Sequence, residues 1–121
     1  MKKPGPSHPI EIAANGDRLR AYANGALIAD SQNVLTLREA NYPPVHYFPR
    51  ADIVSGVLDP TRHKTYCPYK GEADYFNISL DGALLENAAW RYSEPYPHVS
   101  QIQDHVAFYT DRIDVAAVSE K

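Results

Sequence analysis

Apolar and polar residues alternate with a period of two along most of this chain, which is the pattern of β-strands buried on one face. The first forty residues contain four such segments, at residues 10–12, 19–22, 26–29 and 34–39. Asn15-Gly16 and Asn24-Gly25 separate the first three segments, and both dipeptides favour two-residue hairpin turns. We therefore predict an antiparallel meander, in which each strand pairs with the next one along the chain.

The middle of the chain begins with a break at residues 42–44, because a residue that precedes proline avoids helical geometry. The alternation then predicts a short strand at residues 45–49. Apolar residues at helical spacing between residues 50 and 58, with Asp52 in the first turn, predict one or two helical turns. Asp59-Pro60 should end these turns.

The second half of the chain returns to the period of two. Strands are predicted at residues 65–67, 73–80, 88–92, 105–109 and 113–118. Asp81-Gly82 is a further hairpin signal, and a short helix is predicted at residues 97–103. We therefore predict a mainly β, antiparallel fold with one or two short helices. It should form a single domain over residues 10–121, preceded by a flexible tail at residues 1–9.

Composition and charge narrow the classes of function. The 121 residues suffice for one domain, and ten Pro and six Gly argue against a helical bundle. A net charge of −3 argues against nucleic-acid binding, which usually needs a basic surplus. We see no signal peptide and no apolar segment that could span a membrane, so we expect a cytoplasmic protein. The single cysteine excludes an internal disulfide and any zinc site built on several thiolates.

The most concentrated polar segment spans residues 61–71. It contains three cations, Arg62, Lys64 and Lys70, and no acidic residue. In a chain of negative net charge, such a segment can attract an anionic ligand, and its interleaved tyrosines add flat ring surfaces. The alternative is a solvated basic loop with tyrosines packed beneath it.

Cys67 lies in the same segment and has two interpretations. A cation at Lys70 would favour the reactive thiolate, whereas a buried cysteine would act as a small apolar side chain. A cysteine nucleophile would also need a base, for which the candidates are His46, His63 and His98. A zinc site shared with His63 is disfavoured, because the four-residue spacing suits a helix and not the strand predicted here. We therefore expect no metal and no cofactor.

Two further residues have alternative interpretations. Asp52 is either a general base or an acidic residue favoured at the start of a helix. Trp90 is either a core anchor or, with Tyr92 and Tyr96 nearby, part of a ring-lined pocket for a flat or apolar ligand.

Several short motifs together resemble a known family. They are Thr65-Tyr66-Cys67-Pro68-Tyr69-Lys70-Gly71 followed by Ala73 and Tyr75, Val45-x-Tyr47-x-Pro49-Arg50-x-Asp52, Ala89-Trp90-x-Tyr92-x-x-Pro95, and Val106-Ala107-Phe108-Tyr109. In this order, over residues 18–118, they resemble the family called domain of unknown function 427 (DUF427). The resemblance implies a β-tent fold, as in methionine sulfoxide reductase B and the thalidomide-binding domain of cereblon. Those relatives often hold zinc between paired cysteine hairpins, and since Cys67 is alone, that site does not carry over.

The resemblance also singles out the residues that match its motifs, which are Tyr47, Arg50, Asp52, Cys67, Lys70, Tyr75, Trp90 and Tyr92. We expect them to line one pocket between the two halves of the sheet. There, Lys70 and Arg50 would hold an anionic or carbonyl group of a ligand. Trp90 and Tyr92 would pack against its flat part.

The leading interpretation is therefore a domain that binds a small molecule, with catalysis as an option. In an enzyme, Asp52 would be the general base, and Lys70 would stabilise the negative charge that develops during the reaction. Cys67 would be either the nucleophile or a residue of the pocket wall. One alternative is a protein-interaction module whose aromatic side chains bind a peptide. A second alternative is nucleotidyl transfer, a label sometimes given to the family, which would require a divalent metal. The sequence shows neither the Gly-Ser loop nor the paired aspartates of common nucleotidyltransferases.

Overall fold

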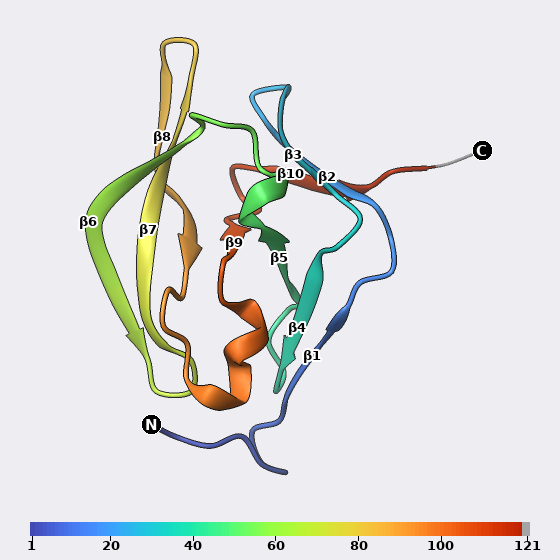
Figure 1. Ribbon diagram of the computed structural model, residues 1–121, viewed down its shortest axis with the longest axis vertical. Helices are drawn as coiled ribbons and strands as arrows, with labels where there is room; N and C mark the ends of the chain where they lie inside the picture. Colours follow the sequence, from blue (N-terminus) through green and yellow to red (C-terminus); the bar gives the residue numbers. More distant parts are fainter. Residues whose placement is uncertain (120–121) are drawn as a thin grey trace.

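The computed structural model describes residues 1–119, which form ten β-strands and two short 3-10 helices (Figure 1). The strands are β1 (Ile10–Ala14), β2 (Leu19–Ala23), β3 (Ala26–Ser31), β4 (Leu35–Glu39), β5 (Val45–Pro49), β6 (Leu58–Cys67), β7 (Gly71–Leu80), β8 (Ala83–Arg91), β9 (His105–Phe108) and β10 (Asp114–Ala117). The 3-10 helices are η1 (Arg50–Asp52) and η2 (Pro97–Ile102). Within residues 1–119, no helix has the length and apolar character that crossing a membrane requires.

The strands form two antiparallel sheets, which confirms the predicted mainly β fold. The larger sheet has seven strands in the order β1-β4-β5-β9-β8-β7-β6, and the smaller sheet has the order β10-β2-β3. In Figure 1, the long strands β6, β7 and β8 stand on one side, β1 and β4 stand on the other, and η2 lies at the lower end. The predicted hairpin turns at Asn24-Gly25 and Asp81-Gly82 are confirmed, since they connect β2 to β3 and β7 to β8.

The predicted meander of the first forty residues is wrong in its pairing. β1 pairs with β4 in the larger sheet, whereas β2 pairs with β3 and β10 in the smaller one. The chain therefore changes sheets at Asn15-Gly16 and closes no hairpin there. The Asn15 side-chain amide donates to Thr36 Oγ1 at 2.9 Å, and its backbone N–H donates to the Val34 carbonyl oxygen. These contacts with the β4 region, about twenty residues away, outweigh the local preference for a hairpin.

The segment at residues 50–58 also differs from its prediction, because only η1 is helical. The backbone N–H of Val54 donates to the carbonyl oxygen of Ile28 at 2.8 Å, and Ile53 forms a β-bridge with Ala29. The backbone groups that a longer helix would use are thus bound to β3.

Asp59-Pro60 does not end the helical turns as predicted, because η1 already ends at Asp52 and β6 runs through Asp59-Pro60 from Leu58 to Cys67. A proline removes one backbone donor, and edge strands tolerate this loss because one side of the strand has no partner. β6 is such an edge strand of the larger sheet. Its register with β7 is irregular between Pro60 and Lys64, which absorbs the local disturbance.

Two hydrophobic cores lie on opposite faces of the larger sheet. Adjacent residues of β5, Tyr47 and Phe48, belong to different cores, and so do Tyr75 and Phe76 of β7. Because successive side chains of a strand point to opposite faces, the two cores cover the two faces. The first core also contains buried residues of the smaller sheet, and the second is rich in tyrosine.

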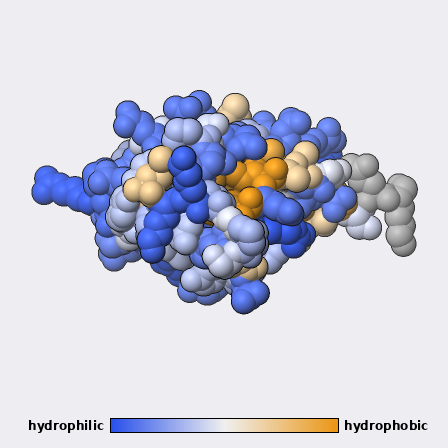
Figure 2. All heavy atoms as spheres, turned by 90° about the horizontal axis from the view of Figure 1, so that it is seen from below, coloured by the Kyte–Doolittle hydropathy of each residue, from blue (hydrophilic) through white to orange (hydrophobic). Residues whose placement is uncertain are grey.

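Some hydrophobic surface remains uncovered. Figure 2 shows the molecule from below, where hydrophobic side chains gather in one patch with hydrophilic side chains around it. Exposed apolar area with a polar rim is common where proteins bind other molecules.

Candidate functional site

A pocket with two adjoining chambers opens beside the tyrosine-rich core. The outer chamber has a volume of about 480 Å³ and the inner chamber about 210 Å³. Glu39, Lys70, Trp90 and Tyr109 line both chambers, together with part of the loop at residues 42–44. The outer chamber also contacts Cys67, His46, Pro44 and Phe108. The inner chamber is completed by four buried side chains, those of Leu37, Tyr47, Tyr75 and Tyr92.

Lys70 is positioned by a close approach between two backbone segments. Its carbonyl oxygen accepts a hydrogen bond of 3.0 Å from the backbone N–H of Tyr96. Gly71 follows with a φ of +112°, and a Cβ atom there would lie 3.4 Å from the Glu94 carbonyl oxygen. A glycine at position 71 therefore allows the β6–β7 turn to approach this segment and to direct Lys70 into the pocket.

A buried ion pair lies between the two chambers. The Lys70 ammonium donates to the Glu39 carboxylate, and the two side chains are 10% and 12% exposed. His8 bonds to the other Glu39 oxygen at 2.7 Å and stacks on the Tyr69 ring with a centroid distance of 3.9 Å. Burial alone would raise the pKa of the Glu39 carboxyl, but the hydrogen bonds from Lys70 and His8 outweigh it, and the pKa lies below its ordinary value. Glu39 is therefore ionised at neutral pH.

Sequence reasoning does not identify Glu39 or His8. Glu39 ends an alternating segment of the sequence. His8 falls in the segment at residues 1–9 that is predicted to be a flexible tail, and this flexibility stays a prediction. Acidic residues at strand ends are common, so Glu39 alone does not predict an ion pair with Lys70, which follows 31 residues later.

Aromatic side chains form much of the pocket wall. The ring centroids of Trp90 and Tyr109 lie 4.5 Å apart, and the hydroxyls of Tyr75 and Tyr109 lie 3.3 Å apart. Burial raises the pKa of Tyr109 to about 12, and the hydrogen bond with Tyr75 raises it in the same direction. Burial also raises the pKa of Tyr47 and of Tyr92. These phenols therefore stay neutral and can donate hydrogen bonds at physiological pH.

Tyr92 differs from the other buried tyrosines of the pocket. Tyr75 lies within hydrogen-bond distance of Thr65 Oγ1 and Tyr109, and Tyr47 is hydrogen-bonded to Trp90. The Tyr92 hydroxyl has no such partner in the part of the chain that the structure describes, although the residue is only 7% exposed. Within residues 1–119 only Arg91 Nε is a buried side-chain polar atom without a partner, so the Tyr92 hydroxyl keeps some access from the chamber that the residue lines.

The structure brings together most of the residues expected in one pocket. Tyr47, Cys67, Lys70, Tyr75, Trp90 and Tyr92 line one or both chambers. Arg50 and Asp52 line neither, so the expectation of one shared pocket does not hold for these two residues.

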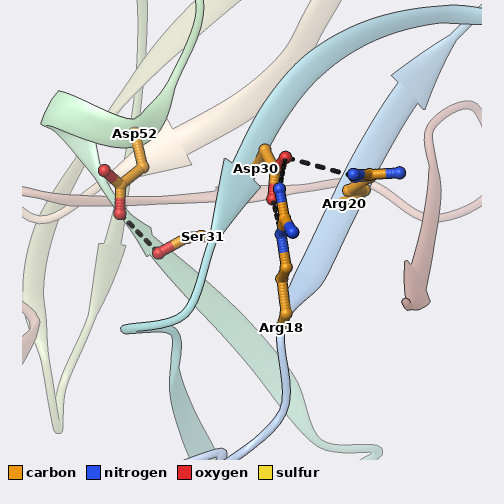
Figure 3. A network of polar contacts seen from close by, with 5 residues as sticks. All are labelled: Arg18, Arg20, Asp30, Ser31 and Asp52. Carbon is orange, nitrogen blue, oxygen red and sulfur yellow. Dashed lines mark hydrogen bonds and ion pairs between the residues drawn. The ribbon is translucent and has the colours of Figure 1, made fainter. Parts of the chain in front are cut away.

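Arg50 and Asp52 have other contacts. The Arg50 guanidinium lies over the Phe76 ring, 5.2 Å from its centroid, on the face of β7 opposite to Tyr75. Asp52 accepts a hydrogen bond of 2.5 Å from the Ser31 hydroxyl, which ties η1 to β3 (Figure 3). The short 3-10 turn thus directs both side chains away from the pocket, and Asp52 joins two elements of the fold.

Next to Ser31, Asp30 is the centre of a surface network (Figure 3). The Arg18 guanidinium donates to both Asp30 oxygens at 2.8 and 2.7 Å, and Arg20 donates at 3.1 Å. The hydrogen bonds from Arg18 are the main cause that lowers the pKa of Asp30 to about 2. This network supports the smaller sheet and has no part in the pocket.

Cys67 shares the outer chamber with His46, one of its candidate bases. His46 Nδ1 lies 2.9 Å from Thr36 Oγ1, and burial, with a smaller contribution from the Arg38 charge, lowers the pKa of His46. Its ring is therefore neutral at neutral pH, but no hydrogen bond joins Cys67 to a histidine within residues 1–119. A nucleophilic role for Cys67 stays a prediction. Over the same residues, no group of three or more His, Cys, Asp or Glu side chains is arranged to hold a metal ion.

A comparison with models of protein families gives a match. The model of a family described as a domain of unknown function (DUF427) matches residues 11–119, which include every residue that lines the two chambers. No curated protein matches the chain.

Proposed function

Since the chain belongs to the family described as a domain of unknown function (DUF427), we propose that its function is to bind a small, flat molecule in the two-chamber pocket. One observation carries this proposal. Aromatic and proline side chains bound an outer chamber of about 480 Å³, which also contacts the buried Lys70–Glu39 pair. Small-molecule sites usually have this form, with a few hundred Å³ of volume, mainly apolar walls and few polar groups.

The outer chamber would hold the flat part of the ligand. Trp90 and Tyr109 provide ring surfaces, and Pro43 and Pro44 add rigid apolar area. A ring that packs against an aromatic side chain gains about 0.5–1.5 kcal/mol beyond the burial of its area. Because proline and aromatic side chains have few rotamers, little conformational entropy is lost when a ligand contacts them.

Lys70 and Glu39 would bind the polar part of the ligand. Both side chains are charged, largely buried and held in place by their mutual hydrogen bond. Hydrogen bonds to such charged groups contribute about 1.5–3 kcal/mol, more than those between neutral groups. Catalysis is not part of the proposal, because Asp52, the expected general base, lies away from the pocket.

The proposal is tested by titrating isotope-labelled protein with flat heteroaromatic fragments at about 1 mM, the range in which weak fragments bind. We expect selected fragments to shift the amide resonances of residues that line the chambers. Tyr109→Ala should abolish these shifts because it removes a ring wall. Tyr66→Ala is the matched control, since Tyr66 is 61% exposed and lines neither chamber. If no fragment shifts the pocket resonances of the wild type, the proposal is overturned.

A further inference from the structure

The Tyr92 hydroxyl is an unused hydrogen-bond donor inside the inner chamber. The residue is 7% exposed, lines this chamber, and has no hydrogen-bond partner for its hydroxyl among residues 1–119. The hydroxyl is not a buried unsatisfied atom, so it remains accessible from the chamber. A ligand atom that accepts a hydrogen bond from Tyr92 would therefore use a donor that no other side chain of residues 1–119 occupies.

Lys70 offers further unused donors in the same chamber. An ammonium group has three N–H donors. One donates to Glu39, and the part of the chain that the structure describes provides no other side-chain partner. Lys70 and Tyr92 both line the inner chamber, so their donors face a common space of about 210 Å³. This set of donors suits an acceptor atom such as an oxygen.

The charge balance of the inner chamber disfavours an anion. Lys70 and Glu39 are the ionised residues that line it, and their charges cancel. His8 also contacts Glu39, but it lines neither chamber. A ligand carboxylate would therefore place a second negative charge beside Glu39, and a buried charge without compensation is strongly unfavourable. A neutral carbonyl oxygen accepts the same hydrogen bonds without this cost.

We propose that the inner chamber selects an uncharged aromatic carbonyl compound, such as an aryl carboxamide, whose carbonyl oxygen accepts hydrogen bonds from Tyr92 and Lys70. The aromatic ring of the ligand then lies in the outer chamber against Trp90 and Tyr109. Tyr92 donates a hydrogen bond to the carbonyl oxygen, and the charge of Glu39 sets the preference for an uncharged head group. The inference rests on the proposed function, because it assumes that the pocket holds a flat ligand.

The experiment uses matched probe pairs that differ only in charge at the head group. Benzamide is compared with benzoate, and nicotinamide with nicotinate, by titration at about pH 7, where the carboxylates are ionised. We expect the amides to bind on the order of tenfold more tightly than the acids. Tyr92→Phe should weaken binding of the amides by about three- to tenfold, the value of one hydrogen bond. Tyr66→Phe, which removes a hydroxyl outside the pocket, is the matched control and should leave binding unchanged.

A second readout does not need a ligand. Since the Tyr92 hydroxyl has no partner, Tyr92→Phe should keep or raise the melting temperature, whereas Tyr75→Phe, which removes a bonded hydroxyl, should lower it. Acids that bind the pocket as tightly as the amides would overturn the inference and leave the proposed function in place. An amide affinity that Tyr92→Phe does not change would also overturn it. Failure of amides, acids and all other flat fragments to reach the pocket would overturn the proposed function itself.

Discussion

The Glu39 carboxylate at the end of β4 and the Lys70 ammonium in the β6–β7 turn form a buried ion pair across 31 residues of sequence. In the larger sheet, β5, β9 and β8 lie between β4 and β7. Four strand spacings of about 4.8 Å would separate β4 from β7 by roughly 19 Å in a flat sheet. The contact therefore requires a strongly curved sheet, and the pocket lies in the hollow of this curve.

Removing the cation of this pair should destabilise the protein. Lys70→Met leaves the Glu39 carboxylate buried with only His8 as a partner, and we expect a loss of about 3 kcal/mol in the free energy of unfolding. The double variant Lys70→Met/Glu39→Gln should recover a large part of this loss, because it leaves no unpaired charge. Urea denaturation measures both effects. A loss below about 0.5 kcal/mol for Lys70→Met would show that the pair contributes as little as a surface salt bridge.

The lowered pKa of Glu39 makes stability depend on pH. A carboxyl whose pKa is lower in the folded than in the unfolded state stabilises the fold above its unfolded pKa, here near 4.5. This contribution is lost as the pH falls through the folded pKa. The melting temperature of the wild type should therefore fall more steeply below pH 4.5 than that of Glu39→Gln. Asp30 and Asp74, whose pKa values are also lowered, titrate in both proteins, so parallel curves would contradict the prediction.

The sequence predicts local features of this fold well and long-range ones poorly. The turns at Asn24-Gly25 and Asp81-Gly82 follow from the residues that occupy them, because each needs a positive φ. Asn15-Gly16 carries the same signal but closes no hairpin, since its contacts are with β4. The choice of partner strand depends on the packing of both cores, which no local pattern contains.

The same limit applies to the pocket. Tyr75 could be assigned to a face of its strand from the alternation alone, because its neighbour Phe76 packs in the other core. Asp52 could not be excluded from the pocket, because its partner Ser31 lies 21 residues away in a strand whose position the sequence does not fix. Glu39 could not be assigned to the pocket for the same reason, because its partner Lys70 lies 31 residues away in the sequence.

Replacement of Gly71 should destabilise the fold more than replacement of a glycine in an open turn. Gly71→Ala forces an L-residue to a φ of +112° and places its Cβ 3.4 Å from the Glu94 carbonyl oxygen. Gly82→Ala is the matched control, because its φ is +76° and a Cβ there meets no atom within 4 Å. We expect Gly82→Ala to cost about 1 kcal/mol and Gly71→Ala about 2–3 kcal/mol in thermal unfolding. Gly71→Ala should also weaken fragment binding by displacing Lys70, and equal effects of the two variants would contradict this role.

Asp52 should matter for stability and not for ligand binding. Asp52→Ala leaves the buried Ser31 hydroxyl without its acceptor, and we expect a loss of about 1–3 kcal/mol in the free energy of unfolding. Ser31→Ala should cost a similar amount. The double variant should cost much less than the sum of the two single variants, because the two residues share one interaction. Fragment affinity should be the same in Asp52→Ala as in the wild type, since Asp52 lines neither chamber. A variant that keeps its stability but loses fragment binding would instead assign Asp52 to the site and overturn its role as a tie between η1 and β3.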